Sequence, residues 1–125
     1  MNISREDVEQ YLSDVKEAIK KDKVTVSTRD KNDQFFLDYI IDEQKRTEIL
    51  LDLTVEDFSE VVNNEHPGRE YELLYIFGKD VKLTPRFGGA ERSVSLYIKF
   101  NKLKNINVIV ISFHEQEYSL NYAFR

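Results

Sequence analysis

The clearest alternation of apolar and polar residues lies between residues 95 and 114, which predict two β-strands joined by a short loop. Apolar and polar residues alternate through the first segment, SLYIKF (95–100). Because successive side chains of a strand point to opposite faces, this segment has one apolar and one polar face. The second segment, VIVISFH (108–114), is apolar at almost every position, as expected for a strand covered on both faces. This hairpin is expected to form the centre of the fold.

Pairing of Phe100 with Ile109 would align the two strands, because a slip by one residue would mix charge into the apolar layer. A register two residues away satisfies the same condition. Directly opposite residues of an antiparallel pair share a face. One face would then be a core layer of Leu96, Ile98, Phe100, Ile109, Ile111 and Phe113. The other face would collect Tyr97, Lys99, Ser112 and His114.

Residues 4–23 show the period of an amphipathic helix. Ser4 followed three residues later by Asp7 is typical of a helix N-cap. Apolar residues then recur along one face of the predicted helix, at Val8, Tyr11, Leu12, Val15, Ala18 and Ile19. This stripe is expected to pack on the core.

Three short segments follow the predicted helix. Residues 24–27 are rich in β-branched side chains and predict a strand. Residues 29–33 predict a polar loop, in which Arg29 could contact an anion but is expected to be solvated. The apolar cluster at residues 35–41 fits either a helix or a strand, because its pattern does not separate the two.

Two further helix starts are indicated before residue 60. Asp42 predicts the N-cap of a helix that ends near Leu51, and Thr54 predicts the N-cap of another. Leu53 before this second cap is placed to pack on Phe58, a hydrophobic staple. The second helix is expected to continue through Val62.

From residue 70 the period changes to two, and a strand is predicted over residues 71–78. It could continue through residues 79–83 past a bulge at Gly78, since a glycine inside a strand often marks one. Residues 84–90 predict a loop, and residues 118–124 predict an edge strand or a segment lying across the core. The order predicts one α+β domain over residues 1–125, with N-terminal helices packed on an antiparallel sheet of three to five strands.

The composition limits the number of domains and the cellular compartment that we expect. A chain of 125 residues that is 41% hydrophobic fits one packed domain. The absence of cysteine excludes disulfides and thiolate metal sites, and a reducing cytoplasm is the expected location. Residues 1–5 show no signal peptide, and no run approaches the ~20 apolar residues that span a membrane.

Charge is distributed unevenly along the chain, whose net charge is −5. Residues 1–78 hold 10 basic and 19 acidic residues, a net −9. Residues 79–104 hold 7 basic and 2 acidic residues, a net +5. This asymmetry indicates an anionic partner for the basic stretch, although lysines that only guard strand edges give the same pattern.

Several standard sites are excluded by the absence of their motifs. The chain contains no phosphate-binding glycine loop, no nucleophile elbow and no zinc-protease motif. A metal site would need carboxylates beside His66 or His114, and none is expected. His66 precedes Pro67 in a predicted turn and is expected to have no role.

The polar face of the central hairpin suits metal-free cleavage of RNA by its own 2′-hydroxyl group. That reaction needs a base, an acid and fixed positive charge on the phosphate. An imidazole exchanges protons readily near neutral pH, so His114 is the candidate acid or base. Tyr97 could share the proton transfer or orient the hydroxyl, and Lys99 could hold the phosphate.

Further RNA contacts are expected from the basic stretch and from a nearby tyrosine. Tyr75 or Tyr71 could stack on an unpaired base. The cationic candidates for RNA binding are Lys79, Lys82, Arg86 and Arg92.

Four segments of the chain resemble the motility quorum-sensing regulator (MqsR) toxin family, bacterial messenger-RNA endonucleases of the RelE-like fold. They are VKEAIKKDKVTVSTR (15–29), EILLDLTVEDFSEVV (48–62), LYIKF (96–100) and VIVISFHE (108–115). The resemblance implies the RelE/ParE-like toxin architecture and a ribosome-independent RNA cleavage without cofactor or metal. It also implies an antitoxin protein encoded next door as a partner.

The resemblance also assigns roles by position. The family's catalytic tyrosine corresponds to Tyr97, and the lysine that follows Ser-Phe in its last strand corresponds to His114. Two positions depart from the family pattern: a lysine corresponds to Glu60 and a glutamine to Glu72. Acids at these positions would repel a phosphate unless the geometry differs. The alternative function is therefore a non-catalytic member of the same fold that binds a protein, such as a gyrase poison or an inactive partner.

Overall fold

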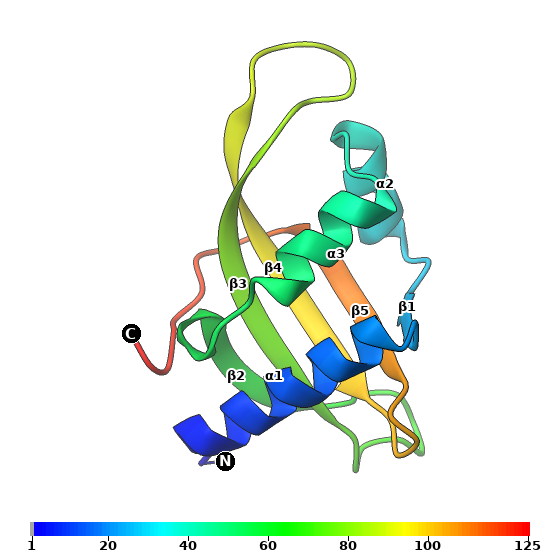
Figure 1. The fold of residues 1–125 in the computed structure, drawn as a ribbon, viewed down its shortest axis with the longest axis vertical. Helices are drawn as coiled ribbons and strands as arrows, with labels where there is room; N and C mark the ends of the chain where they lie inside the picture. The colour runs from blue at the N-terminus through cyan, green and yellow to red at the C-terminus, as the bar shows by residue number, and fades with distance from the viewer. Residues whose placement is uncertain (1) are drawn as a thin grey trace.

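A five-stranded sheet forms the centre of the molecule, and helices α1 and α3 cross one of its faces (Figure 1). The computed structural model describes residues 2–125; Met1, at the start of the stretch expected to lack a signal peptide, lies outside them. The elements are α1 (Arg5–Lys20), β1 (Val24–Val26), α2 (Asp30–Asp38), α3 (Glu43–Leu51), the 3₁₀ turn η1 (Val55–Asp57), β2 (Phe58–Asn63), β3 (Leu73–Leu83), β4 (Arg92–Lys102) and β5 (Val108–Glu115).

The strand order is β1-β5-β4-β3-β2, which confirms a small α+β fold. The neighbours β5, β4, β3 and β2 are antiparallel, but β1 runs parallel to β5. The sheet is therefore mixed, and the expectation of a purely antiparallel sheet was wrong. Asp22, in the left-handed conformation with φ of 56°, ends the turn after α1 and sends the chain along the edge of β5.

The N-terminal helix forms as its sequence pattern predicts. The Ser4 side chain accepts a hydrogen bond from the Asp7 amide, and the Asp7 carboxylate accepts one from the Ser4 amide, each at 3.1 Å. The two bonds satisfy amides that the first helical turn leaves unpaired. The apolar stripe faces the sheet, and its buried members are Val8, Tyr11, Leu12, Val15 and Ala18.

Helix α2 replaces the polar loop predicted for residues 29–33 and resolves the ambiguity of residues 35–41. Its first turn consists of the polar residues Asp30 to Asp33, which resemble a loop in the sequence. Asn32 and Phe35, three residues apart on one helix face, are nevertheless both buried. The next helix, α3, begins as predicted, because the Asp42 carboxylate accepts a 2.7 Å hydrogen bond from the Lys45 amide.

The helix predicted to start at Thr54 is only a single 3₁₀ turn, followed by the edge strand β2. The cap itself is present, since the Thr54 amide donates to the Asp57 carboxylate at 2.9 Å. Beyond this turn the backbone of β2 pairs with β3, with an irregularity between Phe58 and Glu60. The prediction of a helix through Val62 was wrong because pairing with a distant strand overrides the local cap.

Strand β3 runs without a bulge past Gly78, because its pairing with β4 is regular from Leu74 to Leu83. Gly78 instead allows the C-terminal segment, residues 116–125, to lie against the sheet. A Cβ atom at position 78 would lie 2.8 Å from the Leu120 Cδ1 atom and would overlap the Tyr122 hydroxyl. Residues 118–124 therefore form no strand; they cross the sheet, and the Ala123 amide donates to the Phe58 carbonyl.

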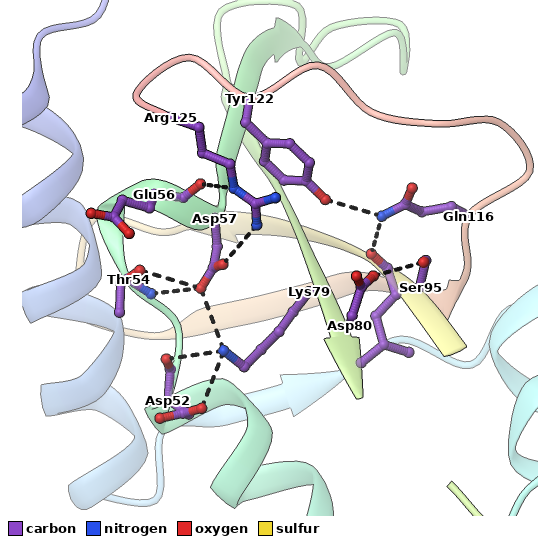
Figure 2. Close-up of polar contacts among 11 residues, drawn as sticks. Asp52, Thr54, Glu56, Asp57, Lys79, Asp80, Ser95, Gln116, Tyr122 and Arg125 are labelled. Atoms are coloured by element: carbon purple, nitrogen blue, oxygen red, sulfur yellow. Dashed lines mark hydrogen bonds and ion pairs between the residues drawn. The ribbon is translucent and has the colours of Figure 1, made fainter. Parts of the chain in front are cut away.

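The two faces of the sheet differ in what covers them. We call the face that carries α1 and α3 the helix face and the opposite one the outer face. The helix face holds the core, which includes Val94, Leu96, Ile98, Phe100, Val108, Val110 and Phe113. The C-terminal segment crosses the outer face and continues round the β2 edge, where Arg125 binds Glu56 and Asp57 (Figure 2).

The register between β4 and β5 contains a bulge that the sequence did not reveal. Lys99 pairs with Ser112 and Phe100 pairs with Val110, which leaves Ile111 unpaired. Alternate residues therefore change face at this point, so Val108 and Val110 join the helix face together with Phe113. The expected pairing of Phe100 with Ile109 was wrong, and Ile109 and Ile111 face outward.

Candidate functional site

The candidate site is a cleft on the outer face, over the middle of β4 and β5. Tyr97 pairs with His114 across these strands, and Lys99 pairs with Ser112 one step along. The Tyr97 and His114 rings stack with their centroids 5.3 Å apart and their planes 16° apart. The prediction that these four side chains share one face is confirmed. They line a cleft of about 530 Å³.

Two cations that the sequence did not place at the site also line the cleft. Arg29 and Lys31 flank the first residue of α2, and the packing of α2 against β5 brings them beside Lys99. Lys31 forms an ion pair with Glu117 of the C-terminal segment. Arg29 was expected to be a solvated loop residue. The helical spacing of Asn32, Phe35, Phe36 and Tyr39 is the signal that could have placed it.

The electrostatics of the cleft favour an anion next to Lys99. Burial lowers the pKa of Lys99 first, and the positive charges of Arg29 and Lys31 lower it further, while Glu65 opposes them. The positive charges of Arg29 and Lys99 therefore lie in one small region, whereas Lys31 is paired with Glu117. An anion bound there would relieve their mutual repulsion, which is the property expected of a phosphate site.

Tyr97 and His114 differ in the protons they can exchange. Burial, followed by the nearby Tyr118 and Glu60, raises the pKa of Tyr97, so its hydroxyl keeps its proton at neutral pH. The His114 Nδ1 atom lies 2.9 Å from the Glu115 carbonyl oxygen. Because a carbonyl oxygen only accepts, this contact requires a proton on Nδ1, so the neutral form of the ring carries its lone pair on Nε2. Tyr97 is thus a proton donor, and His114 presents a proton acceptor.

A groove of about 640 Å³ continues from the cleft along the outer face toward β2. Its apolar lining comes from Val62, Leu74, Ile76, Ile109 and Ile111. Glu60 lies in this groove and pairs with Ile76, which in turn pairs with Lys99. Glu60 is exposed and stands in the same row across the sheet as Lys99, two strands away.

Glu72 lies in a different part of the molecule from Glu60, although both were predicted as possible acid–base residues. Its carboxylate forms an ion pair with Arg69 at 2.8 Å and accepts hydrogen bonds from the Asn64 and Asn101 amides. These contacts, the Arg69 hydrogen bond first, lower the pKa of Glu72 to about 2. Glu72 therefore anchors the β2–β3 loop and holds no proton to donate near neutral pH.

Tyr75 and Lys79 were predicted to bind RNA, but β3 turns both toward the helix face. Tyr75 is buried and stacks on Tyr11 with the ring centroids 3.7 Å apart. The Lys79 ammonium lies 3.1 Å from the Asp52 carboxylate and 3.6 Å from that of Asp57 (Figure 2). The physical reason is the period of two, which places odd-numbered residues of β3 away from the cleft.

The other predicted RNA contacts lie toward the β3–β4 hairpin end. The Arg86 guanidinium donates to the Phe36 and Tyr39 carbonyl oxygens at 2.7 and 3.1 Å. Arg92 lies over the Tyr39 ring at 5.6 Å. Lys82 is exposed but four residues beyond Gly78, the partner of Tyr97, or roughly 13 Å along the strand. Of the five predicted contacts, all of them described residues, none lines the cleft.

The described part of the chain contains neither a cluster of possible metal ligands nor a helix suited to span a membrane. Among residues 2–125, no three His, Asp or Glu side chains are grouped so as to hold a metal ion. His66 lies in the exposed β2–β3 loop with its Nδ1 atom 3.1 Å from the Pro67 carbonyl oxygen. Over the same residues, no helix combines the length and the apolar character needed to cross a membrane.

Comparisons with known proteins do not identify the chain. No protein-family model, no curated protein and no solved structure matches it.

Proposed function

We propose that this chain is a metal-independent endoribonuclease that cleaves messenger RNA, the toxin of a bacterial type II toxin–antitoxin pair. The observation that supports it best is the cleft in which Tyr97, Lys99 and His114 meet the two cations at the start of α2. The RelE-like architecture and the cognate antitoxin, both implied by the resemblance, are part of this proposal. The reaction would take place inside the cell.

The cations of the cleft would bind the scissile phosphate. Arg29 can present its planar guanidinium to two phosphate oxygens, and Lys99 supplies a point charge beside it. Fixed positive charge of this kind stabilises the extra negative charge that develops on phosphorus in the transition state.

The proton donor and acceptor found in the cleft would complete the reaction. The His114 Nε2 atom would accept the proton of the RNA 2′-hydroxyl, whose oxygen attacks the adjacent phosphorus. As the 2′-oxygen bond forms, the bond to the 5′-oxygen breaks, and Tyr97 would donate a proton to that leaving oxygen. The products are a 2′,3′-cyclic phosphate and a free 5′-hydroxyl.

The apolar groove beside the cleft would hold a base of a single-stranded substrate. Val62, Ile109 and Ile111 are partly exposed and give the groove an apolar lining, and Tyr118 stands at the border between cleft and groove. An unpaired base can occupy such a surface, whereas a duplex keeps its bases stacked inside. Glu60 on the opposite side would exclude a second phosphate from the groove.

The proposal is tested with purified protein, a messenger-RNA transcript and EDTA in the buffer. We expect cleavage that leaves 2′,3′-cyclic phosphate ends, detected by mass spectrometry. Tyr97→Phe and His114→Ala should each slow cleavage about 100-fold or more, because each removes one proton transfer. Lys20→Met on the exposed side of α1 is the matched control and should keep the full rate. Unchanged rates in both site variants would contradict the assignment.

One observation favours the second candidate, a chain that acts by binding a protein. Leu37, Ile40 and Phe87 are 55%, 53% and 86% exposed. Leu37 and Ile40 lie near the end of α2 and Phe87 lies in the β3–β4 loop, and the Ile40 amide donates to the Thr84 carbonyl between these two segments. A pulse of expression in bacteria separates the candidates. Growth arrest with loss of RNA supports the nuclease, whereas arrest with DNA damage and intact RNA supports the protein-binding function.

A further inference from the structure

Asn32 is a polar side chain that is almost completely buried, at 1% exposure, and its hydrogen bonds all go to backbone groups. Its amide nitrogen donates to the Ser27 and Ile111 carbonyl oxygens at 3.0 and 2.9 Å. Its amide oxygen accepts from the Phe113 amide at 2.8 Å. One side chain thus joins the end of β1, the start of α2 and the middle of β5.

The position of these bonds along β5 is specific. Strand β1 pairs with β5 only as far as Val110, and the Ser27 amide adds one more bond to the Val110 carbonyl. Beyond that point the edge of β5 has no strand beside it. Asn32 supplies the missing partner for Ile111 and Phe113, the residues on either side of Ser112 at the bulge. An edge left without such partners would be free to slip.

The bulge decides which side chains reach the cleft. If the pairing of Phe100 with Val110 continued without the extra residue, Tyr97 would lie opposite Phe113 rather than His114. His114 would then point toward the helix face, and a phenylalanine would occupy its place beside Tyr97. The pair of proton-exchanging groups exists only while the bulge is held at Ile111.

We propose that Asn32 is a positioning residue of the cleft: its amide holds the β5 bulge in the register that turns His114 toward Tyr97. The same side chain fixes the first turn of α2, from which Arg29 and Lys31 project, so it sets the cations and the imidazole relative to each other. Its effect on the rate rests on the proposed nuclease function, whereas its effect on geometry does not.

The experiment compares Asn32→Ala with Val15→Ala, a substitution on α1 of a fully buried core residue whose side chain has no hydrogen-bonding group. Both variants are studied at a temperature where each is fully folded. The first readout is the set of nuclear Overhauser effects between the Tyr97 and His114 rings. We expect these effects to be lost in Asn32→Ala and kept in Val15→Ala. Their persistence in Asn32→Ala would overturn the proposal whether or not the protein cleaves RNA.

The second readout is the rate of RNA cleavage. In Asn32→Ala, kcat should fall roughly 100-fold and by more than KM rises, because the reacting groups are misplaced while the apolar groove remains. Val15→Ala should keep the wild-type kcat. Equal losses in both variants would show that Asn32 contributes only stability. A wild-type protein without any cleavage would remove the proposed function and leave the first readout to decide the role of Asn32.

A measurement on the wild-type protein covers the case in which Asn32→Ala does not fold. The Asn32 side-chain amide protons and the Phe113 backbone proton should exchange slowly with deuterium, since all of them are buried in hydrogen bonds. The exposed side chain of Asn105 provides the fast-exchanging reference. Exchange of the Asn32 protons as fast as those of Asn105 would overturn the proposal.

Discussion

The two faces of the sheet differ in how completely their side chains are buried and in how polar they are. On the helix face, alternate residues of β4 from Val94 to Phe100 are fully buried in the hydrophobic core. On the outer face, the residues between them include Tyr97 and Lys99, half-buried with their charges and hydroxyls toward a cleft. The helix face gains stability from complete burial, whereas the outer face keeps groups whose burial opposes their charge. Residues that stabilise the core and residues that line the cleft therefore alternate along the same strand.

The largest expected effect is a loss of stability caused by a substitution on the helix face. Phe100→Ala should lower the free energy of unfolding by about 3–5 kcal/mol, because it removes a fully buried aromatic ring and leaves a cavity. Urea denaturation measures this change. The folded fraction should still show the ring contacts between Tyr97 and His114, since these belong to the other face. Loss of those contacts in the folded protein would show that the faces are coupled.

The next effect is on the outer face, where Lys99→Met should slow RNA cleavage about 100-fold without loss of stability. The folded-state pKa of Lys99 lies below the usual 10.5 because burial opposes its charge. The charged form therefore costs stability at neutral pH, and this cost disappears as pH rises through the usual lysine range. Removing the charge should leave the urea midpoint unchanged or raise it. A lower midpoint would mean that Lys99 supports the fold rather than the chemistry.

The smallest effect sharpens the difference between the two acids of the outer face. Glu72 has its pKa lowered to about 2 from a usual 4.5, so its stabilising contribution is complete above pH 4.5 and is lost as pH falls toward 2. Glu72→Gln should therefore destabilise the protein at pH 7 and show a smaller further loss in acid. Urea midpoints at pH 7 and pH 3 measure both values. Glu60→Gln, which removes an exposed carboxylate in the groove, is the matched control.

Local patterns in the sequence predicted the parts of the fold that local interactions determine. The caps at Ser4 and Asp42 and the apolar stripe of α1 are confirmed, since each depends on residues within two turns. The shared face of Tyr97 and His114 is confirmed as well, because two strands of alternating pattern can pair in few ways.

The errors occur where distant partners decide the structure. Thr54 is a real cap, but β3 draws the following residues into a strand. No glycine in the sequence marks the bulge at Ile111, and the bulge depends on Asn32, 79 positions away. The orientation of Lys79 toward Asp52 and Asp57 likewise depends on where η1 packs. The cations Arg29 and Lys31 were missed because a polar helix start and a polar loop have the same composition.

The close approach at Gly78 has a consequence for the evolution of the chain. The backbone there is tight because Gln116, Leu120 and Tyr122 lie across it, so the constraint belongs to the pair of segments and not to the strand alone. Among divergent relatives, those with a different ending after β5 should be free to carry alanine, serine or a larger residue at the equivalent position. Those that retain the tyrosine should retain the glycine, and the two positions should be inherited together.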